Sequence, residues 1–231
     1  RDTILESNLS CLPSDIDALV LGLVHRLQKL TGPVAWNQQE GCFAWTVQNF
    51  RGKKVAFIGF RPSFWGDISG EVGHFLGSQL GIKEVLYFGK LGSLKPGMRP
   101  NTWLATGGRS IVREQTVEWE NILTKSVEKL AKNDTVVRTH VTLGSVLHET
   151  KDWLSSLPRS VDFVDPEVGM MGQAAVRNGI RFGYLHIISD YVAEKYEEDL
   201  SNERMGSVLE RRAKLYRLVQ KVLGDHLSRG K

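Results

Sequence analysis

The chain has 231 residues, of which 41% are hydrophobic and 24% are charged, and its formal net charge is +4. This composition is ordinary for a soluble globular protein, and the length fits one large α/β domain or two small ones. No apolar run reaches the roughly 18 residues needed to span a bilayer, which excludes a membrane-spanning chain. No linker rich in proline, glycine or serine divides the sequence, so we expect a single domain over residues 1–231.

The cysteines and the basic residues exclude further classes. Cys11 and Cys42 form neither a disulfide framework nor a metal-ligand spacing, so we expect no metal cofactor and favour a reducing, cytoplasmic location. An organelle stays open, because the sequence starts at Arg1 and a leader could precede it. Much of the basic excess lies in the last helical stretch without interleaved aromatic residues, which indicates a solvated face rather than a nucleic-acid partner.

The predicted elements begin with a helix. Residues 14–30 have Ser14 as a cap and apolar residues on one face, which predicts an atypical helical segment within about residues 1–35. Two strands joined by a hairpin-like connection follow at 42–47 and 54–58. Further strands are predicted at 84–88, 102–106, 135–143, 160–164 and 181–188, and helices at 65–80, 116–131, 149–157, 167–178 and 202–227. This alternation predicts an α/β fold with a mixed, mostly parallel sheet and helices on both faces.

An acidic residue follows the last predicted strand. Residues 181–188 form a buried-strand pattern that runs directly into Ser189-Asp190. A carboxylate at this position is not needed for folding, and desolvation would raise its pKa so that it can hold or deliver a proton. Ligands bind at this edge of open α/β sheets. An N-cap role for the pair in a following turn remains the alternative.

A second acidic segment, Asp165-Pro166-Glu167, lies between a short predicted strand and a helix. A carboxylate near a helix N-terminus is favoured by the helix dipole, so Glu167 has a structural explanation. The functional alternative is a carboxylate that accepts hydrogen bonds from a sugar diol. With Asp190, this segment suggests a site that binds hydroxyl groups and protonates a leaving group.

Residues 142–149 pass from a predicted strand into a helix and contain Ser145 and His148. We take both as candidate substrate-binding residues. A lone histidine is more often structural than catalytic, although His148 could stack on a ring or donate a hydrogen bond.

Two glycine-containing turns complete the set. Residues 59–63, Gly-Phe-Arg-Pro-Ser, could present backbone N–H groups to an anion together with Arg61, or could form a tight turn capped by Ser63. Residues 89–93 contain two glycines that allow close backbone approach, and Lys90 could neutralise an anion or point to solvent. All five segments follow predicted strands, so we expect them to converge on one sheet edge.

The order of these motifs resembles that of the nucleoside phosphorylase superfamily, which includes purine and uridine phosphorylases and methylthioadenosine/adenosylhomocysteine nucleosidases. The resemblance covers about residues 42–223. Residues 59–63 resemble the family's Gly-Met-Gly-Ile-Pro-Ser turn, and residues 89–92 resemble its Gly-Ser-Cys-Gly or Gly-Ser-Ala-Gly loop. Residues 164–167 resemble its Val-Glu-Met-Glu segment, and residues 189–190 match its Ser-Asp at a strand end.

The resemblance implies cleavage of the N-glycosidic bond of a nucleoside by phosphate or water, through a transition state like an oxocarbenium ion. By this resemblance Asp190 protonates the leaving base and Ser189 orients it. Glu167 holds the ribose hydroxyls, Pro166 packs beneath the sugar and His148 flanks the base. The resemblance also implies a homo-oligomer and no cofactor, with phosphate as a possible co-substrate.

The sequence departs from the family at the anion-binding positions. Tyr87 stands where hexameric phosphorylases carry an arginine, Lys90 replaces the loop serine, and Arg61 replaces a glycine of the early turn. Lys90 and Arg61, with Gly89 and Gly59, could rebuild an anion site, or phosphate binding could be lost. The family's first strand is not evident. Phosphorolysis, hydrolysis and a non-catalytic nucleoside-binding or scaffolding domain of a larger protein stay open, and the two retained carboxylates favour an enzyme.

Overall fold

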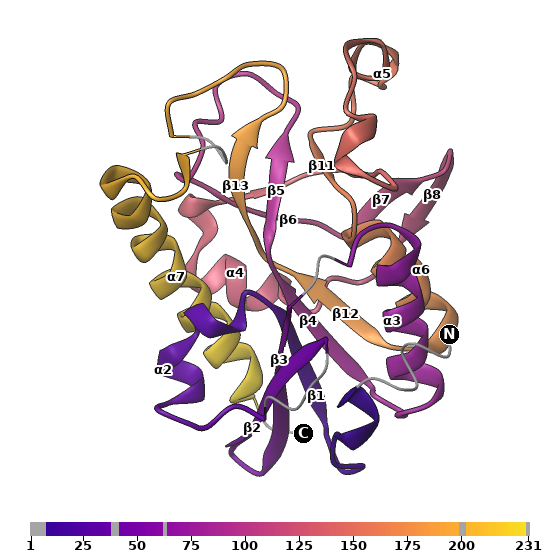
Figure 1. The fold of residues 1–231 in the computed structure, drawn as a ribbon, viewed down its shortest axis with the longest axis vertical. Helices are drawn as coiled ribbons and strands as arrows, with labels where there is room; N and C mark the ends of the chain where they lie inside the picture. The colour runs from indigo at the N-terminus through magenta and orange to yellow at the C-terminus, as the bar shows by residue number, and fades with distance from the viewer. Residues whose placement is uncertain (1–7, 38–41, 62–63, 199–201, 230–231) are drawn as a thin grey trace.

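The computed structural model describes residues 8–37, 42–61, 64–198 and 202–229 (Figure 1). The strands are β1 (Ala18–Gly22), β2 (Phe43–Phe50), β3 (Lys53–Phe60), β4 (Glu84–Phe88), β5 (Lys90–Ser93), β6 (Leu104–Thr106), β7 (Arg109–Val112), β8 (Gln115–Glu118), β9 (Thr135–Val137), β10 (His140–Thr142), β11 (Phe163–Asp165), β12 (Arg181–Tyr184) and β13 (His186–Tyr191). The α-helices are α2 (Gln28–Thr31), α3 (Asp67–Ser78), α4 (Thr124–Leu130), α5 (Lys151–Ser156), α6 (Val168–Asn178) and α7 (Gly206–Leu227). Short 3-10 turns are η1 (Asn8–Cys11), η2 (Val24–Arg26), η3 (Lys132–Asp134) and η4 (Val146–His148).

The strands form two sheets. A five-stranded sheet has the order β12-β4-β1-β3-β2, and an eight-stranded sheet has the order β8-β7-β10-β11-β5-β13-β6-β9. The chain passes from the first sheet to the second at Gly89, between β4 and β5, and at Leu185, between β12 and β13. Most strand pairs are parallel, which confirms the predicted mixed, mostly parallel α/β architecture.

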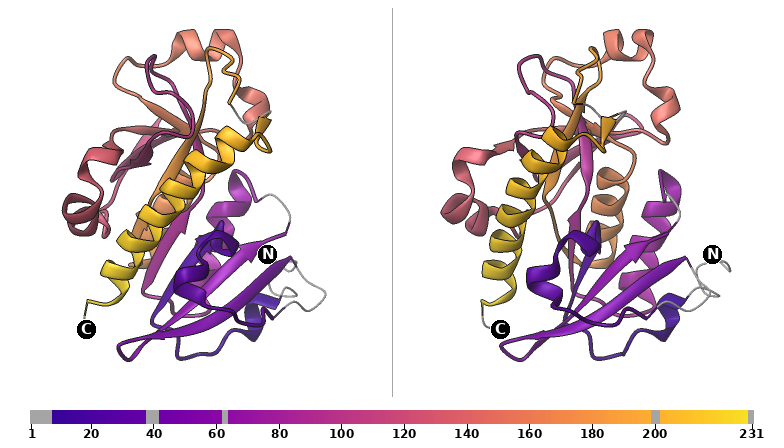
Figure 2. Two further views of the ribbon diagram at one scale, coloured as in Figure 1. Left: turned by 90° about the vertical axis from the view of Figure 1, so that its left-hand side faces the viewer. Right: turned by 60° about the vertical axis from the view of Figure 1, so that its left-hand side comes forward.

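Helices cover both faces of the five-stranded sheet. One hydrophobic core joins that sheet to α3 and α6, and a second core joins its other face to α4 and α7. Figures 1 and 2 show α7 and α4 on one side of the strands and α3 and α6 on the other. In the described part of the chain, no helix combines the length and the apolar character required to cross a membrane.

The predicted helix over residues 14–30 is wrong, because Ala18–Gly22 forms the central strand β1. β1 pairs in parallel with β3 on one side and β4 on the other. Leu19 and Leu21 pack into the α3/α6 core, whereas Ala18 and Val20 pack into the α4/α7 core. A strand buried on both faces is continuously apolar, so it cannot be distinguished by periodicity from a buried helix. A strand therefore lies in the N-terminal segment, where only a helix was predicted.

Only the second half of the predicted helix over residues 116–131 is helical in the structure. Residues 115–118 form β8, which pairs with β7 in a hairpin, and the helix α4 begins at Thr124. Arg113 and Glu114 make the turn with positive φ angles of 46° and 69°. Such turns usually carry asparagine or glycine, so the Arg-Glu pair gave no hairpin signal in the sequence.

Two predicted strands each divide into two. Residues 135–143 become β9 and β10, which lie in separate parts of the eight-stranded sheet. Residues 181–188 become β12 and β13, which belong to different sheets. The predicted hairpin at 42–58, the strand at 84–88 and the helices now labelled α3, α5, α6 and α7 are confirmed, with small shifts of their ends.

Candidate active site

A cavity of about 530 Å³ lies where β1, β4, β11 and β13 end and where β5 begins. This volume lies within the range of ligand pockets in enzymes. The lining residues that can carry chemistry are Tyr87, Lys90, Glu149, Asp165, Glu167, Ser189 and Asp190. Most of the segments predicted to converge therefore do so, at the carboxyl-terminal edge of the parallel strands.

Asp190 reaches the cavity through an irregularity in β13. The register against β5 shifts between Ile188 and Asp190, and bulges of this kind redirect side chains near active sites. A Cβ atom on Gly92 would lie only 3.1 Å from Asp190 Oδ2, so glycine leaves space for the carboxyl group. Ser189 Oγ donates to Asp190 Oδ1 at 2.7 Å and lies 3.2 Å from the carbonyl oxygen of Leu91. Ser189 therefore fixes the orientation of Asp190.

Glu167 is held by the residues around it through its backbone. The Glu167 and Val168 N–H groups donate to Asp165 Oδ1 at 3.0 and 2.9 Å, so Asp165 caps the first turn of α6. The Glu167 carbonyl accepts from Met171 N at 3.0 Å. Within the described residues, its carboxyl group makes no hydrogen bond or ion pair, and the residue is 7% exposed. The carboxyl group is thus left available to a ligand.

Burial sets the protonation of Glu167. Desolvation, followed by the negative charge of Asp165, raises the pKa of Glu167 well above its ordinary value. A carboxyl group in its neutral form can donate one hydrogen bond and accept another. Pro166 lies between these two acids in the cavity wall. A Glu167 carboxyl group that donates one hydrogen bond and accepts another is suited to bind two adjacent hydroxyl groups.

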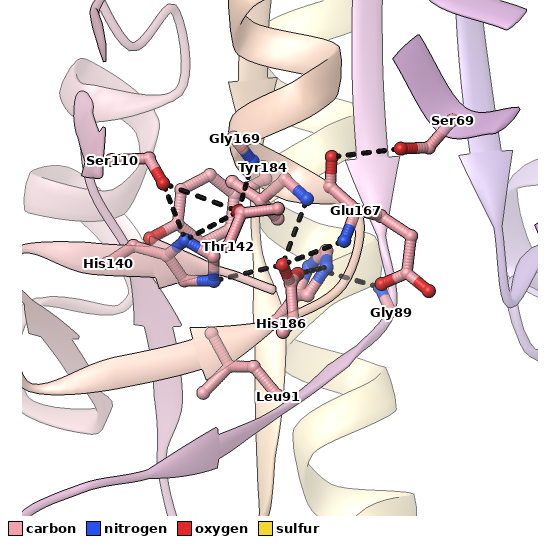
Figure 3. A network of polar contacts seen from close by, with 12 residues as sticks. Ser69, Gly89, Leu91, Ser110, His140, Thr142, Glu167, Gly169, Tyr184 and His186 are labelled. Atoms are coloured by element: carbon pink, nitrogen blue, oxygen red, sulfur yellow. Dashed lines mark hydrogen bonds and ion pairs between the residues drawn. The ribbon is translucent and has the colours of Figure 1, made fainter. Parts of the chain in front are cut away.

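Two buried histidines that were not predicted as site residues, His140 and His186, lie beside Asp165, and Figure 3 shows both of them. His140 Nε2 lies 3.0 Å from Asp165 Oδ1, and His186 Nε2 lies 3.6 Å from Asp165 Oδ2. Both rings are fully buried. Burial by itself raises the pKa of Asp165, but the positive charge and hydrogen bond of His140 outweigh it, so that the pKa is lowered. These surroundings therefore favour the ionised form of Asp165, whereas those of Glu167 favour its neutral form.

The outer nitrogens of these rings extend the network (Figure 3). His140 Nδ1 lies 3.0 Å from Ser110 Oγ and 3.3 Å from Thr142 Oγ1, and Thr142 Oγ1 accepts from Gly169 N at 2.7 Å. A Cβ on Gly169 would lie 2.5 Å from Thr142 Oγ1, so only glycine allows α6 to approach this closely. The network connects β7, β10 and α6 beneath the cavity.

His186 connects the network to the second glycine loop. Gly89 N–H donates to His186 Nδ1 at 3.2 Å, which leaves the hydrogen of a neutral ring on Nε2, facing Asp165. Burial lowers the pKa of His186 to about 4, with a smaller opposing effect from Asp165. The neutral ring therefore holds the Gly89 loop at a fixed position against the acidic segment.

Lys90 lines the cavity, but its charge is already matched. Lys90 Nζ lies 2.5 Å from Glu203 Oε1, and Arg212 Nη1 lies 2.9 Å from the same oxygen. Desolvation of Glu203 is outweighed by its hydrogen bond to Lys90, so the pKa of Glu203 is lowered. Lys90 therefore enters the cavity wall as one half of an ion pair.

The early turn enters the cavity through Phe60 and not through the predicted residues Gly59 and Arg61. Gly59 lies inside β3, Arg61 is exposed, and neither lines the cavity, whereas Phe60 does. Ser63, the predicted cap, lies outside the described residues. The structure does not bring Arg61 and Lys90 together as cavity residues. The early turn instead contributes aromatic rings, because Phe60 stacks on Phe64 with ring centroids 3.8 Å apart.

The segment 142–149 contributes a residue that the sequence analysis did not select. Ser145 Oγ accepts from Leu147 N at 3.2 Å and caps η4, and His148 is exposed. Neither residue lines the cavity, whereas Glu149 does. Burial, then the charges of Asp190 and Asp165, raise the pKa of Glu149 to about 7. Glu149 could have been found in the sequence as the acidic residue directly after His148.

Comparison with known proteins supports the fold. Neither a family model nor a curated protein sequence matches this chain. Among solved structures, the 5′-methylthioadenosine/S-adenosyl homocysteine nucleosidase of Campylobacter jejuni has a TM-score of 0.73 and 11% identity, covering 91% of this chain and 99% of that one. A futalosine hydrolase mutant of Helicobacter pylori has a TM-score of 0.72 and 13% identity, with coverage of 91% and 99%.

A third structure is the Neisseria meningitidis 5′-methylthioadenosine/S-adenosylhomocysteine nucleosidase in complex with methylthio-immucillin-A. It has a TM-score of 0.68 and 12% identity, covering 92% of this chain and 98% of that one. The chain therefore has the fold of the nucleoside phosphorylase and nucleosidase superfamily, as its motifs predicted. At these identities the likeness establishes the fold and leaves the reaction to the residues of the site.

Proposed function

We propose that this protein is a nucleosidase that hydrolyses the N-glycosidic bond of a purine nucleoside. The observation that carries the proposal is that Asp190 and Glu167 line one cavity. Asp190 acts as the acid for the base, and Glu167 holds the ribose hydroxyls. The structural neighbours are named as nucleosidases and as a futalosine hydrolase, which supports the same class of bond cleavage.

The proposed reaction is the addition of water across the bond from C1′ to the base nitrogen. The electron pair of that bond goes to the base, which takes a proton from Asp190. Water attacks C1′ and loses its proton to solvent, and Asp190 regains one from solvent. Ser189 orients the Asp190 carboxyl, and Pro166 forms part of the wall against which the sugar packs.

Water is the favoured acceptor because the cavity is acidic. Four acidic residues line it: Asp165, Glu167, Asp190 and Glu149. The same wall contains the cationic side chain of Lys90, which is paired with Glu203. A phosphate dianion would meet carboxyl groups here without an unmatched cation from the described lining. We therefore propose hydrolysis rather than phosphorolysis, without a cofactor.

The test is base release from a nucleoside panel in the presence and absence of phosphate. The panel includes 5′-methylthioadenosine, S-adenosylhomocysteine, futalosine and the common ribonucleosides. We expect release that does not depend on phosphate and that Asp190→Asn abolishes. Release that requires phosphate would contradict hydrolysis. Binding by isothermal titration without any release would favour the alternative, a non-catalytic nucleoside-binding domain.

That alternative has less support from the structure than from the sequence alone. It was based on an apparently missing first strand and on an eroded anion loop, but β1 is present. A hydrolase does not need the anion loop, so its erosion no longer argues against activity.

Two wider expectations accompany the proposal. We expect a homo-oligomer, and exposed apolar side chains such as Leu147, which is 84% exposed, are compatible with one. Analytical ultracentrifugation tests this expectation. We also keep the cytoplasm as the expected location, and the two cysteines are free, as a reducing compartment would leave them.

A further inference from the structure

A second cavity lies at the opposite edge of the five-stranded sheet. Its volume is about 970 Å³, and it is lined by residues at the amino-terminal ends of β3, β4 and β12, before α4 and at the end of α7. Strand β4 connects the two cavities, because Glu84 at its start lines the second and Phe88 at its end lines the first. These two residues are about 13 Å apart at the rise of a β-strand. The described residues that line the two cavities have no member in common, so the second cavity is a separate space.

Cations outnumber acids in the lining of this second cavity. Five lysine or arginine side chains line it against three acids. Three of the cations are matched by acids, in the pairs Lys53–Glu84, Arg181–Glu84 and Arg229–Asp225. Within the described residues, the side chains of Lys83, Lys125 and Glu120 form no ion pair or hydrogen bond. The cavity therefore presents two unmatched cations and one unmatched acid besides Asp17, whose carboxylate accepts from Lys54 N at 2.8 Å.

Two of the lining residues carry buried polar atoms that lack a hydrogen-bond partner within the described chain. These atoms are Trp119 Nε1 and His226 Nδ1. His226 is 7% exposed, and its other ring nitrogen, Nε2, lies 3.1 Å from Glu84 Oε1. The indole N–H can only donate, so its missing partner is an acceptor. A buried polar atom without a partner is unfavourable, and a ligand that supplies one is stabilised there.

The indole ring of Trp119 belongs to an apolar part of the same wall. Its centroid lies 5.5 Å from that of Phe182, which also lines the cavity. A Cβ atom on Gly172 would lie only 2.7 Å from Trp119 Cζ3, so α6 packs closely against the ring and fixes its position. Ile122 and Ile180 extend the apolar lining. An apolar wall with a few polar and charged groups is typical of sites that bind small organic molecules.

We propose that the second cavity binds a small organic anion, with a planar ring against Trp119 and a phosphate or carboxylate group beside Lys83 and Lys125. The unmatched lysines favour a negative charge, and the indole N–H requires an acceptor such as an anionic oxygen. The apolar wall favours a ligand with a ring over a free inorganic ion. The inference does not depend on the nucleosidase reaction, so base release and binding at this site are tested separately.

Isothermal titration of the whole chain tests the chemistry of the ligand. The probes are 1-naphthyl phosphate and 1-naphthoate, which combine a ring with a charge, and inorganic phosphate and 1-naphthol, which each have one of the two. We expect one molecule of a naphthyl anion to bind at least about tenfold more tightly than phosphate or naphthol. The tighter of the two anions distinguishes a phosphate from a carboxylate ligand. Absence of saturable binding by both naphthyl anions, or equal binding of inorganic phosphate, would overturn the inference.

Charge variants locate the bound anion. Lys83→Gln and Lys125→Gln should each weaken binding about two- to fivefold, because exposed charge pairs contribute modestly, and the double variant about tenfold. Glu120→Gln should strengthen binding about twofold, because it removes the unmatched acid. Lys221→Gln changes an exposed lysine of α7 outside the cavity and is the matched control. Binding by the double variant equal to wild type would overturn the inference.

Two further variants separate this cavity from the catalytic one. Trp119→Phe retains an aromatic ring and removes the indole donor, so binding should weaken about three- to tenfold. The thermal midpoint of this variant shows whether it is folded. Lys90→Gln changes the cation of the catalytic cavity and should leave binding unchanged. Binding that is lost in Lys90→Gln and retained in Trp119→Phe would place the anion in the catalytic cavity and overturn the inference.

Discussion

Two buried glutamates, one associated with each sheet, have pKa values shifted in opposite directions because their partners differ. Glu84 begins β4 and is 3% exposed, and Glu167 follows β11 at the cavity and is 7% exposed. Burial opposes ionisation at both. At Glu84, hydrogen bonds to His226 and Lys53 outweigh burial and lower the pKa to about 2. At Glu167 the neighbour is Asp165, and the pKa is raised.

Glu84 has basic partners that differ from the surroundings of the acids in the cavity. Lys53 Nζ lies 2.5 Å from Glu84 Oε1, His226 Nε2 lies 3.1 Å from it, and Arg181 pairs with the other oxygen. At the cavity, Lys90 is held by Glu203. The comparison teaches that the buried acid that stabilises the fold has three basic partners, whereas the Glu167 carboxyl group forms no ion pair within the described residues.

The largest expected effect is on activity. Asp190→Asn keeps the shape of the side chain and removes its proton, so we expect base release from nucleosides to fall about 10²–10⁴-fold. The thermal midpoint should change little. Glu194→Gln removes an exposed acid four residues away and is the matched control. Activity of Asp190→Asn within threefold of wild type would contradict its role as the acid.

For Glu84, the expected effect is on stability. Glu84→Gln leaves Lys53 and His226 without their partner, and breaking a buried pair in this way costs about 3–5 kcal/mol. Chemical denaturation should detect this loss, with base release per folded molecule unchanged. Glu120→Gln, an exposed acid, is the control. A stability equal to wild type would show that Glu84 is not a structural ion-pair centre.

The same residue predicts the direction of a pH effect. The pKa of Glu84 is lowered from 4.5 to about 2 on folding, so its stabilisation is present above pH 4.5. That stabilisation is lost as the pH falls toward 2, because the unfolded chain then binds the proton more readily. Denaturation curves at a series of pH values should show this loss in wild type and a smaller one in Glu84→Gln.

Glu167→Gln should have a smaller effect on activity. It changes the hydrogen bonding to the ribose hydroxyls, and a hydrogen bond between neutral groups contributes about 0.5–1.5 kcal/mol, so kcat/KM should fall about 2–10-fold. With a 2′,3′-dideoxynucleoside the substitution should cost less than about threefold, because the contact is already missing. An equal loss with both substrates would contradict contact with the ribose.

The smallest expected effect concerns Lys90. Glu203→Gln removes its partner and gives the cavity wall an unmatched cation. Because partly exposed ion pairs contribute about 0.2–1 kcal/mol, inhibition by phosphate should become about two- to fivefold stronger at constant ionic strength. Glu197→Gln, an exposed acid in the same region, should leave inhibition unchanged. An unaltered inhibition constant in Glu203→Gln would mean that Lys90 does not face the ligand space.

Much of the site could be predicted because strand ends are marked in the sequence. Ser189, Asp190 and Glu167 follow recognisable strands, and parallel strands bring their carboxyl ends together. Glu149 and Arg61 could not be assigned correctly, since a shift of one or two residues in a loop decides which side chain enters a cavity. His140 and His186 lie inside apolar strands, where nothing local shows that they meet Asp165.

The sequence by itself determined the α/β class, the order of the motifs and the acids at the strand ends, because these depend on local hydrophobic patterns and turn residues. Tertiary structure decided that residues 18–22 form a strand, since pairing with β3 and β4 outweighs helical periodicity. It also decided the charge state of each acid. A carboxyl group keeps or loses its proton according to its burial and its neighbours, and those neighbours come from distant parts of the chain.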